Sequence, residues 1–152
     1  MIPNRVNQMW MDPHQTGMFL GQCAQYCGTQ HAKMLLRVSV ESAEDFAAWV
    51  STQKQPAIQD EKEIAGKRVF ETTACVSCHA VAGTNATGHF GPDLTHLMSR
   101  RTIAAGAAEN TRENLRLWIQ NPDAIKPGSL MPAMKLSDAD LDALTRYLET
   151  LR

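Results

Sequence analysis

Four cysteines form two close pairs, and each pair is followed by side chains that bind metals. These residues are Cys23, Cys27, His31 and Met34 in one segment, and Cys75, Cys78 and His79 in the other. Close cysteine pairs form disulfides, ligate metals or attach a cofactor covalently. The residues around each pair distinguish between these roles.

The sequence Cys75-Val-Ser-Cys78-His79 has the spacing that is typical of covalent haem attachment. Two thiols three residues apart lie on one side of a helical turn, so both can reach the vinyl groups of a haem. The ring of His79 is then directed at the iron. The alternative is a redox-active or zinc-binding Cys-x-x-Cys pair beside an unrelated histidine.

A low-spin haem that carries electrons needs a second axial ligand, and a thioether opposite histidine raises its reduction potential. Met131 is our candidate because it lies in a loop rich in proline and glycine, just before the last predicted helix. Met134 is a rival, unless it packs in the core beneath the haem edge. Trp118 either contacts a haem propionate or is an ordinary core aromatic.

The Gly91-Pro92 step follows His79 closely and is expected to lie in a loop beside the imidazole. The carbonyl of Pro92 would accept the free N–H of the ring. Such a hydrogen bond fixes the tautomer of a ligating histidine and raises its basicity.

Two residue pairs at helical spacing, Gly66 with Phe70 and Leu144 with Tyr147, predict a close crossing of the first and last helices of this region. Together with the Cys-x-x-Cys-His sequence, Gly91-Pro92 and Met131-Pro132, these pairs resemble the class I cytochrome c fold. The resemblance covers about ninety residues and implies an all-α domain that carries one covalent haem c.

The first cysteine pair lies within twelve residues of sequence that also holds an imidazole and a thioether, those of His31 and Met34. Soft sulfur with imidazole suits copper, and weak thioether ligation is a mark of electron-transfer copper sites. One alternative is a Cys23–Cys27 disulfide, with the other two residues incidental. A zinc site is another, although methionine is a poor ligand for zinc.

This segment, from Gly21 to Met34, resembles the binuclear copper-A loop of cytochrome c oxidase subunit II. In that family both thiolates bridge two copper ions. One copper also takes a histidine and a backbone carbonyl, and the other takes a histidine and a methionine. The resemblance implies these ligands: Cys23, the backbone carbonyl of Gln25, Cys27, His31 and Met34. Glutamate is usual where Gln25 stands, but only the backbone ligates.

The second histidine of the family's copper site has no counterpart at the family's position. Only His14 precedes Cys23, in a turn that the family does not use. The sequence also lacks the family's transmembrane hairpin, through which the subunit associates with the membrane, and the first strands of its copper domain. We therefore expect the C-terminal portion of a longer subunit II, in which Met1 is an internal residue or a truncated start.

The elements that must position these residues follow from local pattern. Alternating residues predict a strand at 5–11, and apolar or alternating runs predict two more at 18–20 and 33–40. Ser42 is expected to cap a helix that carries Phe46 and Trp49 on one face. Further helices are predicted over 61–72, from Thr111 to about Asn121, and after Ser137, where leucines at 141, 144, 148 and 151 form the buried stripe.

The predicted fold has two parts. Residues 1–52 form a partial all-β cupredoxin-like segment, residues 53–60 a linker, and residues 61–152 an all-α class I cytochrome c domain. A net charge of −1 gives no indication of a nucleic-acid partner. A hydrophobic content of 43 % is enough for a core.

A copper-A segment followed directly by a cytochrome c domain resembles subunit II of caa3-type oxidases. The resemblance implies that electrons pass from an upstream donor through haem c and copper-A to subunit I, in a complex with the other oxidase subunits. The chain would be the electron-entry subunit of an enzyme, with no catalytic residue of its own. It would act at the periplasmic or outer face of the bacterial cytoplasmic membrane.

Two other functions are compatible with the haem residues. One is a free-standing periplasmic electron carrier whose copper segment does not function. The other is a haem-based gas sensor in which Met131 is displaced by its ligand. Surface or loop positions, rather than ligand roles, are expected for His14, His89 and His96.

Overall fold

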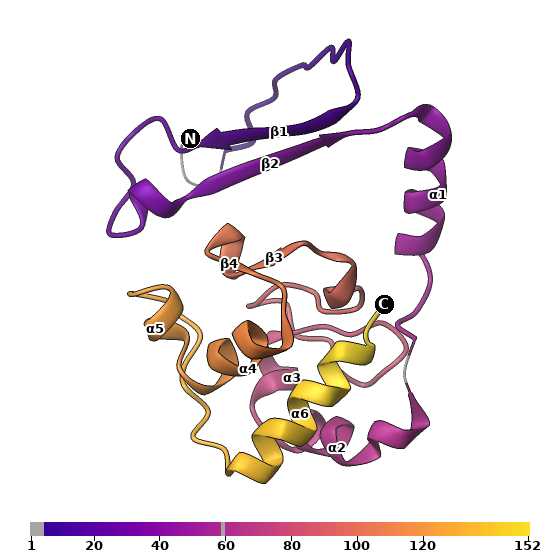
Figure 1. Cartoon of the computed structure of the whole chain (residues 1–152), viewed down its shortest axis with the longest axis vertical. Helices are drawn as coiled ribbons and strands as arrows, with labels where there is room; N and C mark the ends of the chain where they lie inside the picture. Colours follow the sequence, from indigo (N-terminus) through magenta and orange to yellow (C-terminus); the bar gives the residue numbers. More distant parts are fainter. Residues whose placement is uncertain (1–4, 59) are drawn as a thin grey trace.

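The computed structural model of the chain describes residues 5–58 and 60–152 (Figure 1). Residues 1–4 of the predicted copper-A segment and Gln59 of the predicted linker lie outside the described residues. A β-hairpin and one helix come first. A helical body follows, and the hairpin lies over one side of it.

The hairpin pairs β1 (Gly17–Gln22) with β2 (Leu35–Val40) in antiparallel register, with Gln22 opposite Leu35. The N–H of Cys23 donates to the carbonyl oxygen of Met34 at 3.0 Å, which extends the ladder by one rung. The connection between the two strands is therefore the predicted copper loop, and its ends are held together by the sheet.

The strand predicted over residues 5–11 is wrong. This stretch has the alternating pattern, but it is exposed and pairs with no strand in the described part of the chain. A strand is stable only where its backbone groups are paired in a ladder, and the described sheet ends at β1. Two of the three predicted strands, at 18–20 and 33–40, are present as β1 and β2.

Helix α1 (Ala43–Gln53) starts where the sequence predicts, because the Ser42 hydroxyl accepts a hydrogen bond from the Asp45 N–H at 3.0 Å. The rings of Phe46 and Trp49 stack with centroids 5.8 Å apart, yet both remain exposed. Among the described residues before Ala57, none is buried. The hairpin and α1 thus have no core of their own.

The helical body contains five α-helices and one short strand pair among its described residues. These are α2 (Ile64–Thr72), α3 (Cys75–Cys78), β3 (Thr102–Ile103), β4 (Ala108–Glu109), α4 (Arg112–Gln120), α5 (Pro122–Ile125) and α6 (Asp138–Thr150). Thr111 and Ser137 cap α4 and α6 through their hydroxyls, as predicted. Pro122 ends the run of α4 and occupies the first turn of α5, where its missing N–H costs nothing.

Helices α2 and α6 cross at Gly66. A Cβ at this position would lie 2.6 Å from the Cβ of Tyr147 and would also collide with the carbonyl of Ala143. The ring of Phe70 packs on that of Tyr147 with centroids 5.8 Å apart. The predicted helix crossing is therefore confirmed, and it depends on the absence of a side chain at Gly66.

One core fills the body. The predicted stripe on α6, Leu141, Leu144 and Leu148, is buried together with Leu151 beyond the helix end. It packs with buried side chains of α2, α4 and the intervening loops, which are Phe70, Val81, Leu94, Leu97, Ile103, Leu115 and Ile119.

The segment predicted as a linker is attached to this body. Ala57 is buried, and its N–H donates to the carbonyl oxygen of Ala82 at 3.1 Å. His96, predicted at the surface or in a loop, is buried, with 5 % of its surface exposed. Its Nε2–H donates to the carbonyl oxygen of Gln55 at 3.1 Å. The expectation of a surface position is wrong for His96 because the linker covers its loop.

None of the helices within residues 5–58 and 60–152 has the length and apolar character needed to cross a bilayer.

Candidate functional sites

A cavity of about 870 Å³ opens in the helical body, within the usual range for a small-molecule or cofactor site. All the predicted haem-site residues line it. They are Cys75, Cys78, His79, Pro92, Trp118 and Met131, with the rival Met134. Buried leucines and isoleucines of the core form much of the remaining wall.

His79 is held in the orientation that an iron ligand needs. Its Nδ1–H donates to the carbonyl oxygen of Pro92 at 2.7 Å, which leaves Nε2 free for coordination. Gly91 makes this approach possible, because a Cβ there would lie 2.5 Å from Cε1 of the ring. The Gly91 N–H also donates to the carbonyl oxygen of Cys78 at 2.7 Å.

The two thiols of this segment are free and lie at the first and last residues of α3. Burial raises the pKa of the Cys75 thiol, and the Thr73 hydroxyl 3.1 Å from its sulfur only partly opposes this. Redox-active and zinc-binding cysteines are characterised by lowered thiol pKa values.

The cavity wall holds two methionines in reach of a cofactor. Met131 and Met134 both line the cavity and are half-buried, so the choice of Met131 as the second ligand stays a prediction. Trp118 is also half-buried on α4 and lines the same cavity. Its contact with a propionate stays a prediction as well.

Three cationic side chains on the wall were missed by the sequence analysis: Arg37, Arg100 and Lys126. Burial lowers the pKa of Arg100, while the nearby carboxylate of Asp93 raises it. The Arg100-Arg101 pair near the haem residues was a usable sequence signal. Arg37 gave none, because it belongs to β2 in the other half of the chain.

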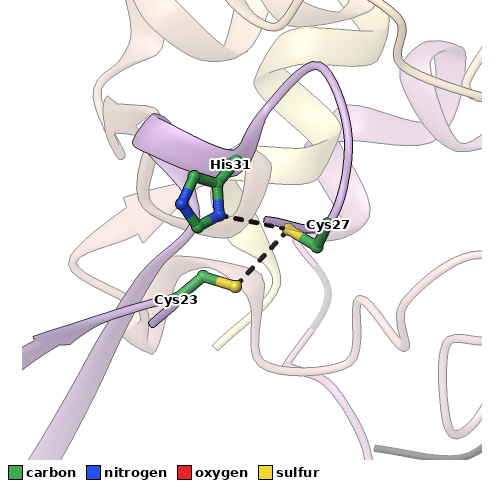
Figure 2. A group of neighbouring side chains, drawn as sticks. All are labelled: Cys23, Cys27 and His31. Carbon is green, nitrogen blue, oxygen red and sulfur yellow. Dashed lines mark hydrogen bonds between the residues drawn. The ribbon is translucent and has the colours of Figure 1, made fainter. Parts of the chain in front are cut away.

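The predicted copper ligands also come together. Figure 2 shows Cys23 at the end of β1, Cys27 in the loop and His31 on a short helical turn, with their side chains pointing toward one another. The Cys27 sulfur lies 3.4 Å from the Cys23 sulfur and 3.8 Å from Nδ1 of His31. Both cysteines are free.

The two remaining predicted copper ligands lie against the same sulfurs. The thioether sulfur of Met34 is 3.7 Å from the Cys27 sulfur, and the carbonyl oxygen of Gln25 is 3.0 Å from the Cys23 sulfur. Two thiols, an imidazole, a thioether and a carbonyl around one point form a donor set that fits copper. His14 is exposed beside Asp12 and lies outside this group.

The paired thiols require a cation if both are to ionise. The hydrogen bond between the two thiols, followed by desolvation and by the charge of Cys23, raises the pKa of the Cys27 thiol. Two thiolates so close together repel each other. A bound metal ion reverses that balance and deprotonates coordinating thiols.

Comparison with known families assigns the two halves of the chain separately. Residues 64–152, which hold the cavity and the Cys-x-x-Cys-His segment, match the cytochrome c family. The chain belongs to the cytochrome c family. Its residues 1–42, which include the copper loop, match a second family described as cytochrome c oxidase subunit II, periplasmic domain.

Relatives that carry both regions are named cytochrome c oxidase subunit 2. The relative from Alkalihalophilus pseudofirmus is 36 % identical over 99 % of this chain, and that from Bacillus subtilis is 36 % identical over 89 %. A third, from Bacillus sp. strain PS3, is 34 % identical over 96 %. This cytochrome c family member spans 44 %, 40 % and 44 % of the three relatives' lengths, respectively. The resemblance to subunit II is thereby confirmed.

Proposed function

We propose that this chain accepts electrons from an upstream donor and passes them to the oxygen-reducing subunit I of a caa3-type cytochrome c oxidase. When bound, haem c and copper-A each supply a one-electron redox couple. Cys75 and Cys78 would bond the haem covalently, and His79 and Met131 would ligate its iron. Oxygen reduction would take place in another subunit of the same enzyme.

The copper loop would supply the second redox site. Cys23 and Cys27 would provide the thiolates, and His31, Met34 and the carbonyl of Gln25 the remaining ligands. The described loop supplies one imidazole, that of His31. It therefore offers every ligand of the binuclear centre except the second histidine. Residues 1–52 would form part of a cupredoxin-like domain, residues 53–60 a linker and residues 61–152 the cytochrome c domain.

The observation that carries this proposal is a direct contact between the two ligand loops. The side-chain amide of Gln30, next to His31, donates to the carbonyl oxygen of Pro127 at 2.5 Å. Pro127 precedes Met131 by four residues in the loop that borders the haem cavity. The chain thus holds its two candidate redox sites beside each other, which replaces diffusional encounter with a fixed local concentration.

The match of residues 1–42 to a periplasmic domain supports a location on the outer face of the bacterial cytoplasmic membrane. The partners we propose are subunit I, the other oxidase subunits and a soluble or membrane-bound electron donor. Anchoring would come from an N-terminal transmembrane hairpin of the kind found in the subunit II family.

Electron transfer between the sites can be followed in the haem-loaded chain after addition of copper(II). A light pulse in the presence of a photoreductant reduces the haem, and its return to the oxidised form is recorded at several protein concentrations. We expect a first-order rate that does not depend on protein concentration. Cys27→Ser should abolish this phase, and Lys54→Ala, outside both sites, should retain it. A rate proportional to protein concentration, or one that Cys27→Ser leaves unchanged, would contradict the proposal.

A further inference from the structure

The haem cavity has a cationic corner at the turn formed by residues 104–106. Lys126 donates from Nζ to the carbonyl oxygen of Ala104 at 3.5 Å. The guanidinium of Arg37 lies over Gly106, where any Cβ would collide with Nη1. Both side chains line the cavity. They come from opposite halves of the chain, since Arg37 belongs to β2 of the hairpin.

The wall at this corner carries no carboxylate of its own, and the nearby carboxylate of Asp93 lies beside Arg100. Neither Arg37, Lys126 nor the neighbouring Arg100 belongs to an ion pair with any side chain that the structure describes. The cavity wall contains these three cations and no aspartate or glutamate among its described residues. Cations gathered at a largely apolar cavity favour an anionic group on whatever fills it.

The hairpin is seated so that Arg37 reaches the cavity. Leu35 and Arg37 are two residues apart on β2 and so share one face of the strand, and both line the cavity. The Cβ of Leu35 lies 3.5 Å from the place a Cβ would take on Gly106. The Gln30–Pro127 hydrogen bond fixes the connecting loop of the same hairpin.

We propose that Arg37, carried by the copper-loop hairpin, binds a propionate of the haem in the cytochrome c cavity. The planar guanidinium matches a carboxylate in a two-point contact, and Lys126 supplies a second positive charge at the same corner. The hairpin then completes the haem site as well as carrying the copper loop. This inference rests on the haem part of the proposed function and does not depend on copper.

The consequence is a sensitivity of the haem to a residue of the other segment. A cation beside the haem disfavours the oxidised iron, which carries one more positive charge than the reduced iron. Removal of Arg37 also leaves a propionate unneutralised, and that negative charge favours oxidised iron in turn. The loss of the cation and the unneutralised propionate charge therefore both lower the reduction potential of the haem.

The test is a spectroelectrochemical titration of the haem-loaded full chain, together with the propionate bending band of its resonance Raman spectrum. At a fixed applied potential, Arg37→Ala should lower the ratio of reduced to oxidised haem roughly tenfold, the effect of a unit charge about 10 Å from a redox centre. The propionate band should shift. Arg37→Lys should recover most of the potential, because it restores the charge.

Lys54→Ala is the matched control, because it removes one positive charge from the same half of the chain outside the cavity wall. An effect of Arg37→Ala no larger than that of Lys54→Ala, with the propionate band unmoved, would overturn the proposal. If Arg37→Ala fails to mature with haem, Arg37→Gln keeps the length and hydrogen-bonding capacity without the charge. An unchanged potential and band in Arg37→Gln would overturn the proposal equally. Failure to bind copper would leave these readouts unaffected.

Discussion

Nδ1 of His79 lies 2.7 Å from the carbonyl oxygen of Pro92, at the wall of the haem cavity. A carbonyl can only accept, so the proton is on Nδ1 and the lone pair is on Nε2. The imidazole is thus fixed in one tautomer, with the ligating nitrogen free. The identity of a second ligand would set the electronic character of a bound iron.

We predict that Met131, and not Met134, is the second axial ligand. The proline after Met131 restricts Met131 to an extended backbone, which holds it in the loop against the cavity. Met131→Leu should abolish the sulfur-to-iron charge-transfer band of the oxidised protein and lower the reduction potential. Met134→Leu is the control and should keep both. The opposite pattern would assign the ligand to Met134.

A methyl group at the helix crossing should destabilise the domain. Gly66→Ala places a Cβ against Tyr147 and the backbone of Ala143, so α2 and α6 must separate. We expect a loss of about 1–3 kcal/mol in the free energy of unfolding, measured by denaturant titration. Ala65→Ser, exposed on the same helix, should change it by less than about 0.5 kcal/mol. Equal effects of the two substitutions would rule out the close crossing.

Alkaline pH should destabilise the fold through Tyr147. Burial, helped by the negative charge of Glu71, raises the pKa of its hydroxyl to about 12. An unfolded tyrosine ionises near pH 10, so the unfolded state loses its proton first and the free energy of unfolding falls between about pH 10 and 12. Denaturation midpoints measured across this range should fall less steeply in Tyr147→Phe. Identical slopes would show that other groups cause the loss.

The pattern of caps and helix faces was predictable because it depends on neighbours in sequence. Ser42, Thr111 and Ser137 satisfy the first N–H groups of their helices by themselves. The contacts of His79 with Pro92 and of Gly66 with α6 followed from a recognisable family pattern. Other features depend on tertiary contacts that no local pattern reports.

Arg37 illustrates such a contact. Arg37 is exposed, as its place on an alternating strand suggests, but the docking of β2 on the 104–106 turn also brings it to the wall of the haem cavity. The stretch from residue 5 to 11 is the opposite case. It has the alternating pattern of a strand, but it pairs with none of the described strands. Burial of His96 likewise depends on where the linker packs.

The haem domain should fold without the hairpin and α1. Every buried apolar side chain among the described residues lies at or after Ala57. A fragment over 55–152, matured with haem, should unfold in one cooperative step and give a reducible low-spin spectrum. A fragment over 60–152 loses Ala57 and its hydrogen bond to Ala82, and should be less stable by about 1–3 kcal/mol. A molten product from the longer fragment would show that the hairpin belongs to the core.

The central claim is that the loop from Cys23 to Met34 binds copper through its thiolates, beside a haem in the same chain. The most direct measurement is the copper content per haem of the oxidised chain, together with its electron paramagnetic resonance spectrum. Because the described loop supplies one imidazole, we predict at most one copper per haem in the 152-residue chain, with thiolate-to-copper charge transfer that Cys27→Ser removes. Two coppers per haem with a seven-line hyperfine pattern would contradict the single-imidazole site. Thiols that titrate as a Cys23–Cys27 disulfide, with no copper bound, would contradict the claim itself.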